Sequence, residues 1–378
     1  MNHHRKGVVA ASIALLMMCG VLTACSSSGD SDSGSANAKL DLAASEAALA
    51  KYKATPTSIP VSEPLKAAPE KGKTFVWMTC QLSACMDMGQ SMKEAVTSLG
   101  WKYQEISYDQ ADPATLVSGM RKALRYDPAY VGMSGVAPET WATIVPEYKK
   151  AGVKIVASYL GKSDLDADVV LQVAGASLNE VQGDALAQWF IADSKGKGTA
   201  LIQTVSDFPS NKIMSDTFVK TVKEDCPDCK VRQVSNSLAD AGAGKIVPAL
   251  VSELRSKPDY GYLVATYAPF LSGLPAALKS AGIADRVKVG GGYPDPVTMQ
   301  AIKDGQFAVA PASSPHIAAY LMVDAAVRDE TGTPQPKGGQ QLDIQMLAKD
   351  VDFKVEASHD VPVDYAEQFQ KLWGVSRG

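Results

Sequence analysis

Residues 129–159 read AYVGMSGVAPETWATIVPEYKKAGVKIVASY, and this stretch decides the fold class. Two short apolar runs, 129–133 and 153–157, flank a longer segment of mixed polarity, 138–151. Short and continuously apolar runs are typical of buried strands, whereas a longer run of mixed polarity is typical of a helix with one buried face. A strand, a helix and a strand joined by short loops predict a parallel β-α-β unit with helices on the faces of its sheet.

The same alternation continues on both sides of this unit. It predicts two similar α/β halves, followed by a loop-rich tail that ends in a short helix at 365–373. In the first half we expect strands at 74–78, 101–107 and 169–173 and helices at 86–99 and 113–126. In the second half we expect helices at 178–193, 210–224, 240–256, 270–281, 295–304 and 316–329, and strands at 199–205, 230–234, 260–265, 287–290 and 307–310.

The composition is that of a globular protein. Of the 378 residues, 46% are hydrophobic and 21% are charged, which supplies a core and excludes wholesale disorder. The net charge is −4 and the Lys and Arg residues are scattered, so the sequence lacks the basic face that nucleic-acid binding requires. A single stretch, at the N-terminus, is apolar enough to meet a membrane, which excludes a polytopic membrane protein.

The N-terminus has the pattern of an export signal. Arg5 and Lys6 precede an apolar run at 8–22, and Leu22-Thr23-Ala24-Cys25 follows. This resembles a bacterial lipoprotein signal, in which residues 1–24 are removed and Cys25 carries the lipid. A lipid-anchored protein on the extracytoplasmic face of the cell membrane is therefore expected. The alternatives are an ordinary signal peptide cleaved nearby and a short membrane anchor.

Residues 25–72 precede the first predicted strand and differ in composition from the rest. Residues 26–36 are rich in Ser, Gly and Asp, which is typical of a flexible tether. Residues 39–52 can form a short helix, and the four prolines in 54–70 favour an extended segment on the surface. The folded domain is expected to begin near Lys73.

Four segments carry a resemblance to a known family: 74–80, 151–159 (AGVKIVASY), 175–192 and 302–311. With the order of elements, they make residues 73–330 resemble the type I periplasmic binding proteins, within them the ribose/galactose-binding branch. The resemblance implies two doubly wound parallel-sheet lobes joined by a hinge. It also implies that the protein captures a small molecule and delivers it to the permease of an ABC importer. A ligand-sensing receptor subunit of the same fold is the alternative.

The resemblance also implies how the chain divides. The N-terminal lobe is expected at 73–174 together with about 312–335, and the C-terminal lobe with the tail at 175–311 together with about 336–378. A binding protein of this kind needs no cofactor and no metal, and it acts as a monomer.

Ligands of this family bind between the lobes, where loops leave the carboxyl ends of the strands. The resemblance places these candidate ligand-binding residues there: Gln81, Ser83, Ser134, Tyr159, Leu160, Phe208, Lys212, Met214, Tyr267, Phe270, Tyr293 and, beside a hinge, Ser313.

The candidate site departs from the sugar-binding pattern of the branch. Sugar binders place an Asp-Arg pair where this chain has Tyr159 and Leu160. They place Asn or Asp at the positions of Tyr267 and Tyr293, and Arg near Met214. Tyrosine offers one hydroxyl and a large apolar face, so an aromatic or partly apolar ligand is predicted. Because aromatic rings also stack on sugars, a sugar-binding protein of the same family is the alternative.

The mature chain retains two close pairs of cysteines besides Cys25. Outside the cytosol such pairs tend to oxidise, and the positions that the resemblance assigns allow only Cys80 with Cys85 and Cys226 with Cys229. Cys226 and Cys229 have the C-x-x-C spacing of redox and zinc motifs, but they precede a predicted strand, which favours a structural disulfide.

No motif of an enzyme is complete. The run from Gly132 to Val136 approaches the G-x-S-x-G turn around a hydrolase nucleophile, but Val136 occupies the place of the last glycine. His316 and His359 are the two histidines of the mature chain, and neither has an evident acid or base partner in the sequence. We therefore expect a binding protein and not an enzyme.

Overall fold

A computed structural model describes residues 40–161, 164–336 and 341–375. The predicted signal peptide at 1–24, the lipid site Cys25 and the tether at 26–36 lie outside the described residues. Within the described part, no helix combines the length and the apolar character that crossing a membrane requires.

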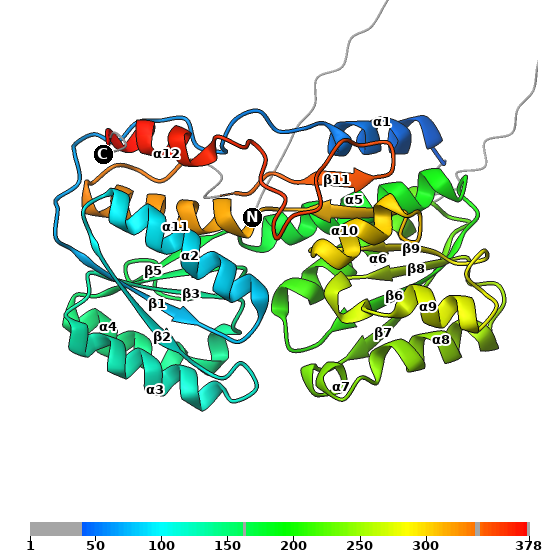
Figure 1. The fold of residues 1–378 in the computed structure, drawn as a ribbon, viewed down its shortest axis with the longest axis horizontal. Helices are drawn as coiled ribbons and strands as arrows, with labels where there is room; N and C mark the ends of the chain where they lie inside the picture. Colours follow the sequence, from blue (N-terminus) through cyan, green and yellow to red (C-terminus); the bar gives the residue numbers. More distant parts are fainter. Residues whose placement is uncertain (1–39, 162–163, 337–340, 376–378) are drawn as a thin grey trace, which may run out of the picture. The chain divides into compact units, whose positions relative to one another are not determined.

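The first lobe is built on a five-stranded sheet that is parallel throughout (Figure 1). Its strand order is β2-β1-β3-β4-β5, which makes β1 and β3 central. Buried apolar side chains, such as Phe75, Trp77 and Val131, account for the central position. The elements are β1 (Thr74–Thr79), α2 (Ser83–Ser98), β2 (Lys102–Ser107), α3 (Pro113–Ala123), β3 (Tyr130–Ser134), α4 (Val145–Ala151), β4 (Lys154–Ser158) and β5 (Val170–Val173).

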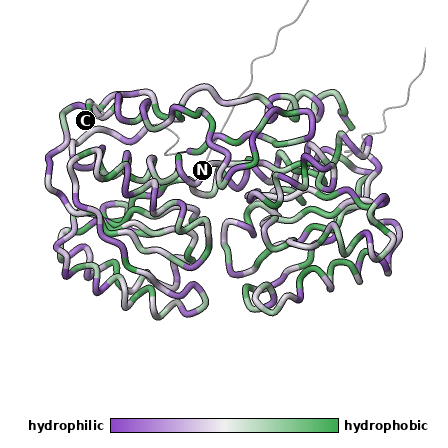
Figure 2. The backbone as a smooth tube through the Cα atoms, viewed as in Figure 1, coloured by the Kyte–Doolittle hydropathy of each residue, from purple (hydrophilic) through white to green (hydrophobic). Residues whose placement is uncertain are grey.

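The second lobe is built on a six-stranded sheet of order β11-β10-β9-β8-β6-β7. All its pairings are parallel except that of β10 with β11. The elements are α5 (Ala176–Asp193), β6 (Thr199–Val205), α6 (Pro209–Asp225), β7 (Lys230–Asn236), α7 (Leu238–Gly242), α8 (Ile246–Ser256), β8 (Tyr262–Ala265), α9 (Leu274–Ser280), β9 (Lys288–Gly291), α10 (Pro296–Lys303), β10 (Val309–Ala312) and β11 (Gln345–Ala348). In Figure 2 the hydrophobic colour follows the central strands and stretches of the neighbouring helices.

The two doubly wound lobes confirm the predicted fold class.

Three of the expected helices are interrupted in the structure, each at a proline or a glycine. The helix predicted at 138–151 begins as two 3₁₀ turns and becomes α4 only at Val145, where a proline occupies the first turn. The helix predicted at 240–256 is divided into α7 and α8, with Gly244 between them at φ +65°. The helix predicted at 270–281 begins at Leu274, because Gly273 before it has a left-handed conformation, with φ +81°.

The C-terminal tail is shared between the two lobes. We expected all of 336–378 in the second lobe, and β11, an element that the sequence analysis missed, does pair with β10 there. The last helix, α12 (Tyr365–Trp373), packs instead on α11 (Pro315–Glu330), which lies against α2 of the first lobe. The stacked rings of Tyr320 and Trp373, 5.8 Å apart, join α11 to α12. The hydrophobic face of α12 determines this position, and no local pattern in the sequence specifies which element covers that face.

The segment before β1 also contacts elements of both lobes. The helix α1 (Leu42–Lys53) packs on α5, and the Tyr52 hydroxyl donates to Asp184 at 2.7 Å. The extended, proline-rich segment then reaches α12, where the backbone N–H of Leu65 donates to the carbonyl of Leu372 at 3.1 Å. Figure 1 shows this blue segment running from α1 past α12 before it enters β1.

A buried ion pair lies within α11. Arg328 Nε donates to Asp324 Oδ2 at 2.6 Å, and neither side chain is exposed. Trp373 Nε1 of α12 donates to the other carboxylate oxygen at 2.9 Å. Arg328 Nη2 donates to the carbonyl of Glu63, in the proline-rich segment, at 2.6 Å. The two charges therefore connect α11, α12 and the segment that precedes β1.

Replacing Arg328 with alanine should lower the free energy of unfolding by about 3–5 kcal/mol, because it leaves the Asp324 carboxylate buried and uncompensated. Urea denaturation of the two proteins measures this difference. The matched control is Arg121→Ala, which removes an exposed ion pair with Glu147 and should lower the free energy of unfolding by about 1 kcal/mol or less. Equal losses in the two variants would contradict a connecting role for Arg328.

Candidate ligand-binding cleft

A cavity of about 390 Å³ lies where the loops leave the carboxyl ends of the strands. The first lobe contributes residues of the loops after β3 and β4 and of the start of α2. The second lobe contributes residues that follow β6, β8 and β9. The tail contributes Ala357, Ser358 and His359. A cavity with walls from both halves at this edge of parallel sheets is the expected position for a bound small molecule.

Half of the twelve candidate ligand-binding residues line this cavity. They are Ser134, Tyr159, Phe208, Tyr267, Tyr293 and Ser313. Their role in binding stays a prediction, but the structure brings them together from separate loops of both lobes.

The other candidates lie outside the cavity lining. Leu160 and Met214 are fully buried in the hydrophobic cores. Lys212 is exposed and forms an ion pair with Asp216 on the same helix. Phe270 packs against the ring of Tyr267, and the Gln81 side chain contacts the neighbouring loop instead of the cavity. The side chain of Ser83 lies outside what the structure describes. Lys212 and Met214 both belong to α6, and residues two positions apart on a helix lie on different faces, which explains why one is exposed and the other buried.

Four aromatic rings form one continuous wall of the cavity. The rings of Tyr159 and Tyr293 lie 6.0 Å apart in an edge-to-face arrangement. Tyr293 is 6.1 Å from Tyr267, which in turn is 6.0 Å from Phe208. Tyr159 belongs to the first lobe and the other three to the second, so the wall includes residues of both. We call these four residues the aromatic wall.

Polar side chains of the protein already engage two of the tyrosine hydroxyls. Tyr293 donates to Asn179 Oδ1 on α5. The Tyr159 hydroxyl interacts with the side chain of Ser313, which accepts from Gln182 Nε2, also on α5, at 3.1 Å. Because these groups engage the two hydroxyls, what the rings of Tyr159 and Tyr293 offer to the cavity is mainly apolar surface.

The aromatic wall is uncharged under physiological conditions. Burial raises the pKa of Tyr267 to about 12, and the nearby Asp295 carboxylate acts in the same direction. Burial also raises the pKa values of Tyr159 and Tyr293 well above the usual value for tyrosine. The three hydroxyls therefore stay protonated at neutral pH.

The charges around the cavity are few and negative. Asp87 and Asp295 line it, whereas none of the described lining residues is Lys or Arg. His359 also lines it, and burial lowers the pKa of its imidazole, which favours the neutral form. Across residues 40–161, 164–336 and 341–375 there is no cluster of three or more His, Cys, Asp or Glu side chains suited to a metal ion.

The sequence analysis missed several lining residues, and Asn211 is the most informative of them. It lies in the first turn of α6, just beyond the strand-end position that the family pattern marks, and is 1% exposed. Asp295 caps the N-terminus of α10 and reaches the cavity as well. Both lie where a helix begins after a strand, a position that could have been searched. The tail residues 357–359 have no such signal, because no strand or helix contains them.

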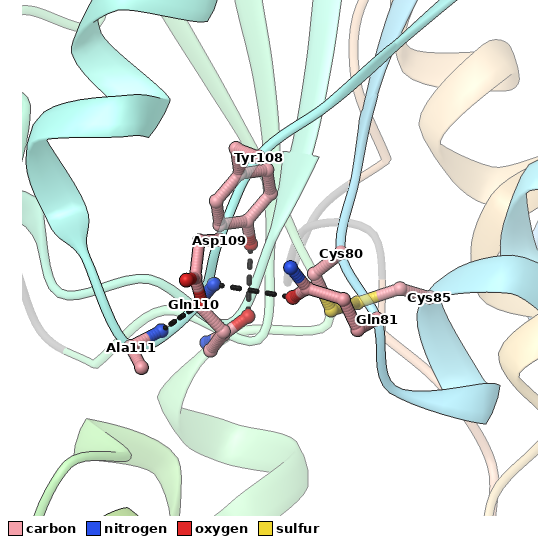
Figure 3. The surroundings of a disulfide bond; sticks show 7 residues. All are labelled: Cys80, Gln81, Cys85, Tyr108, Asp109, Gln110 and Ala111. Carbon is pink, nitrogen blue, oxygen red and sulfur yellow. Dashed lines mark hydrogen bonds between the residues drawn. A yellow bond between two sulfur atoms is a disulfide. The ribbon is translucent and has the colours of Figure 1, made fainter.

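A disulfide joins the end of β1 to the first turn of α2 at the edge of the cavity (Figure 3). Cys80 pairs with Cys85, with 5.5 Å between their Cα atoms, and Cys85 lines the cavity. Between them, Gln81 Oε1 accepts from the backbone N–H of Gln110 at 3.4 Å. Gln110 also accepts from the Tyr108 hydroxyl at 3.0 Å. The disulfide thus restrains two loops that border the cavity.

Cys226 and Cys229 form the second disulfide, between α6 and β7, and neither residue lines the cavity. Both disulfides are the local pairings expected from the sequence. The sulfur atoms of the C-x-x-C motif are bonded to each other, so they form a structural link and not a zinc site.

Two lobes of this topology with a cavity between their strand ends define the class of type I periplasmic binding proteins. Residues 75–333 match the model of the periplasmic binding protein domain family, and the chain belongs to this family. The match leaves out α1, β11 and α12. No curated protein sequence is similar enough to count as a relative.

Solved structures of low sequence identity share the fold. An ABC transporter periplasmic solute-binding protein from Actinobacillus succinogenes, with bound D-allose, is 16% identical with a TM-score of 0.63, covering 74% of this chain and 98% of its own. A solute-binding protein from Burkholderia graminis, in complex with D-arabinose, is 18% identical with a TM-score of 0.63, covering 76% and 98%. A 5-methylthioribose transporter solute-binding protein from Thermotoga lettingae is 14% identical with a TM-score of 0.64, covering 82% and 99%.

Removing the first disulfide should loosen both loops at the cavity edge. In a Cys80→Ser, Cys85→Ser double variant, we expect amide hydrogens at 80–85 and 108–111 to exchange at least about tenfold faster. The reason is that a small disulfide loop contributes about 2 kcal/mol against opening. Hydrogen exchange followed by mass spectrometry measures this. The matched control, Cys226→Ser with Cys229→Ser, should leave both segments unchanged, and a similar change in the control would contradict a local effect.

Proposed function

We propose that the protein is an extracytoplasmic solute-binding lipoprotein that captures a small molecule between its lobes and delivers it to the permease of an ABC importer. The cavity at the strand ends, with walls from both lobes, carries this proposal. In a two-lobed protein, a ligand that contacts both halves favours the closed arrangement of the hinge, and a partner can recognise that arrangement.

We propose further that the ligand is aromatic or partly apolar. The aromatic wall supports this, because two of its three tyrosine hydroxyls are already engaged with Asn179 and Ser313. Each sugar hydroxyl buried without a partner would weaken binding by about 1–3 kcal/mol. An apolar ring instead gains about 25 cal/mol for each Å² that it buries.

A sugar is the second candidate ligand. Three of the similar solved structures are complexes with D-allose, D-arabinose and 5-methylthioribose. Aromatic rings can stack on the apolar faces of such molecules, and Asp87 and Asp295 could accept from hydroxyl groups. A role as the ligand-sensing subunit of a signalling system uses the same cavity. A sensor kinase gene next to the gene for this protein would favour that role, and a permease gene would favour import.

The ligand class is tested by a thermal-shift screen followed by calorimetry. Aromatic and alicyclic compounds should raise the melting temperature of the mature protein more than hexoses, pentoses or polyols do, because stabilisation follows occupancy. Tyr159→Ala and Tyr293→Ala should each weaken the binding of such a compound at least about tenfold, since each removes a buried ring contact.

The matched control for these variants is Lys212→Gln, whose side chain is exposed and outside the cavity lining. It should leave the affinity unchanged. Micromolar binding of a simple sugar that is lost in Tyr159→Ala and Tyr293→Ala would establish a sugar as the ligand in place of an apolar compound.

Lipid attachment is tested at Cys25. The Cys25→Ser variant should lose labelling by a radioactive or clickable fatty acid and should appear in the soluble or unprocessed fraction, because the thiol is the predicted attachment site. Cell fractionation and labelling measure this, with wild-type protein and a Ser26→Ala variant as controls. Labelling that persists in Cys25→Ser would contradict a lipoprotein.

A further inference from the structure

Two carboxylates line the cavity, one from each lobe. Asp87 lies in α2 of the first lobe, and Asp295 directly precedes α10 of the second. Asp87 forms no hydrogen bond or ion pair with the described residues. Asp295 Oδ1 accepts from the backbone N–H of Thr298 at 2.8 Å and from its hydroxyl at 2.7 Å, which leaves Oδ2 without a described partner. Both side chains are only partly buried, and none of their unpartnered oxygens is closed off from the surface.

Positive charge does not balance these carboxylates within the described cavity lining, which contains no Lys or Arg. Basic side chains that neighbour lining residues pair with other acids: Lys212 with Asp216, and His316 with Asp360 at 2.7 Å. His359 lines the cavity, but burial lowers the pKa of its imidazole and favours the neutral form. A cleft lined by charges of one sign attracts ligands of the opposite sign. The cavity therefore favours a positively charged ligand.

The aromatic wall adds a second attraction for the same kind of ligand. A cation is drawn to the face of an aromatic ring, and the attraction is strongest where water is excluded. The Asp295 carboxylate lies close enough to Tyr267 to act on the pKa of its hydroxyl, so a ring and a carboxylate are neighbours here. Tyr159, Tyr267 and Tyr293 each keep some accessible surface. A ligand with a positive group beside an apolar group can use both features.

Closure of the two lobes makes the charge of the ligand decisive. Closing on a ligand removes water from Asp87 and Asp295, and buried carboxylates without compensation destabilise the closed arrangement. A cation between the lobes compensates both of them. A neutral ligand leaves both uncompensated, and an anion adds a third negative charge.

We infer that the cavity selects an organic cation, in which a positively charged nitrogen is attached to an apolar ring or chain. Asp87 and Asp295 contact the nitrogen, and the aromatic wall contacts the apolar part and the face of the charge. This inference rests on the proposed function, since it names the ligand class of the same cavity. It adds a requirement for positive charge that the aromatic wall alone does not impose.

Three probes of nearly equal shape test the inference: 2-phenylethylammonium, 2-phenylethanol and phenylacetate. They carry a positive, a neutral and a negative group on the same ring. We expect the wild-type protein to bind 2-phenylethylammonium at least about tenfold more tightly than 2-phenylethanol, because the charge adds attraction to rings and carboxylates. Phenylacetate should bind most weakly. Calorimetry with purified mature protein measures all three affinities.

The variants Asp87→Asn and Asp295→Asn remove the charges and keep the side-chain shape, and asparagine can still cap α10. Each should reduce the preference for 2-phenylethylammonium over 2-phenylethanol at least about threefold, and the double variant should bind the two probes about equally. The matched control is Asp216→Asn, which removes an exposed carboxylate outside the cavity lining. It should keep the wild-type preference. Melting temperatures without ligand check that each variant folds, and the wild-type comparison needs no variant.

Each result has a definite meaning. Equal affinity of the wild type for 2-phenylethylammonium and 2-phenylethanol would overturn the requirement for positive charge and leave the proposed capture of apolar ligands intact. Tightest binding of phenylacetate would overturn it as well. A preference for the cation that persists in the double variant would overturn the role of Asp87 and Asp295. Failure of all three probes to bind, with binding of a sugar, would overturn both this inference and the proposed ligand class.

Discussion

The buried ion pair between Arg328 and Asp324 is the constraint on which the arrangement of the chain depends. Two charges with no exposure to water are tolerated only if hydrogen bonds satisfy them. The partners come from far away in the sequence: Trp373 in the last helix and the carbonyl of Glu63 before the first strand. The helix α11 is therefore bonded both to the last helix and to the segment that precedes β1. Ser313, which lines the cavity, lies just before this helix.

Side chains of the helix α5 hold residues of the cavity wall in place. Asn179 accepts from Tyr293, and Gln182 donates to Ser313, whose side chain interacts with Tyr159. The side chains of Asn179, Gln182 and Ser313 thus orient the tyrosine rings of the cavity wall. The polar residues that remain in the lining include Asp295, at the beginning of α10, and Ser358, in the tail. The cavity lining therefore combines the aromatic wall with a small number of polar side chains.

The fold could be predicted from the sequence because strands and helices here are local patterns. The run at 129–159 already contains the repeated unit, and the residues that directly follow strands, such as Tyr159 and Tyr293, do line the cavity. The errors arise where the outcome depends on contacts between distant segments. The position of α12 on α11 follows from the packing of Trp373 on Tyr320, and no local pattern specifies that contact. The same holds for the tail residues 357–359 in the cavity wall.

The backbone conformation of two tyrosines in the cavity lining gives the strongest argument about what their side chains do there. Tyr159 and Tyr293 have left-handed conformations, with φ values of 55° and 52°. Such a conformation destabilises a residue with a bulky side chain by about 1–3 kcal/mol, whereas Asn and Asp adopt it more readily. The resemblance described in the sequence analysis predicts Asp or Asn at these two positions in the sugar-binding members of the branch. Here the same backbone positions hold rings despite the strain. The two rings belong to the aromatic wall, and we propose that apolar surface facing the cavity is what these positions provide to a ligand.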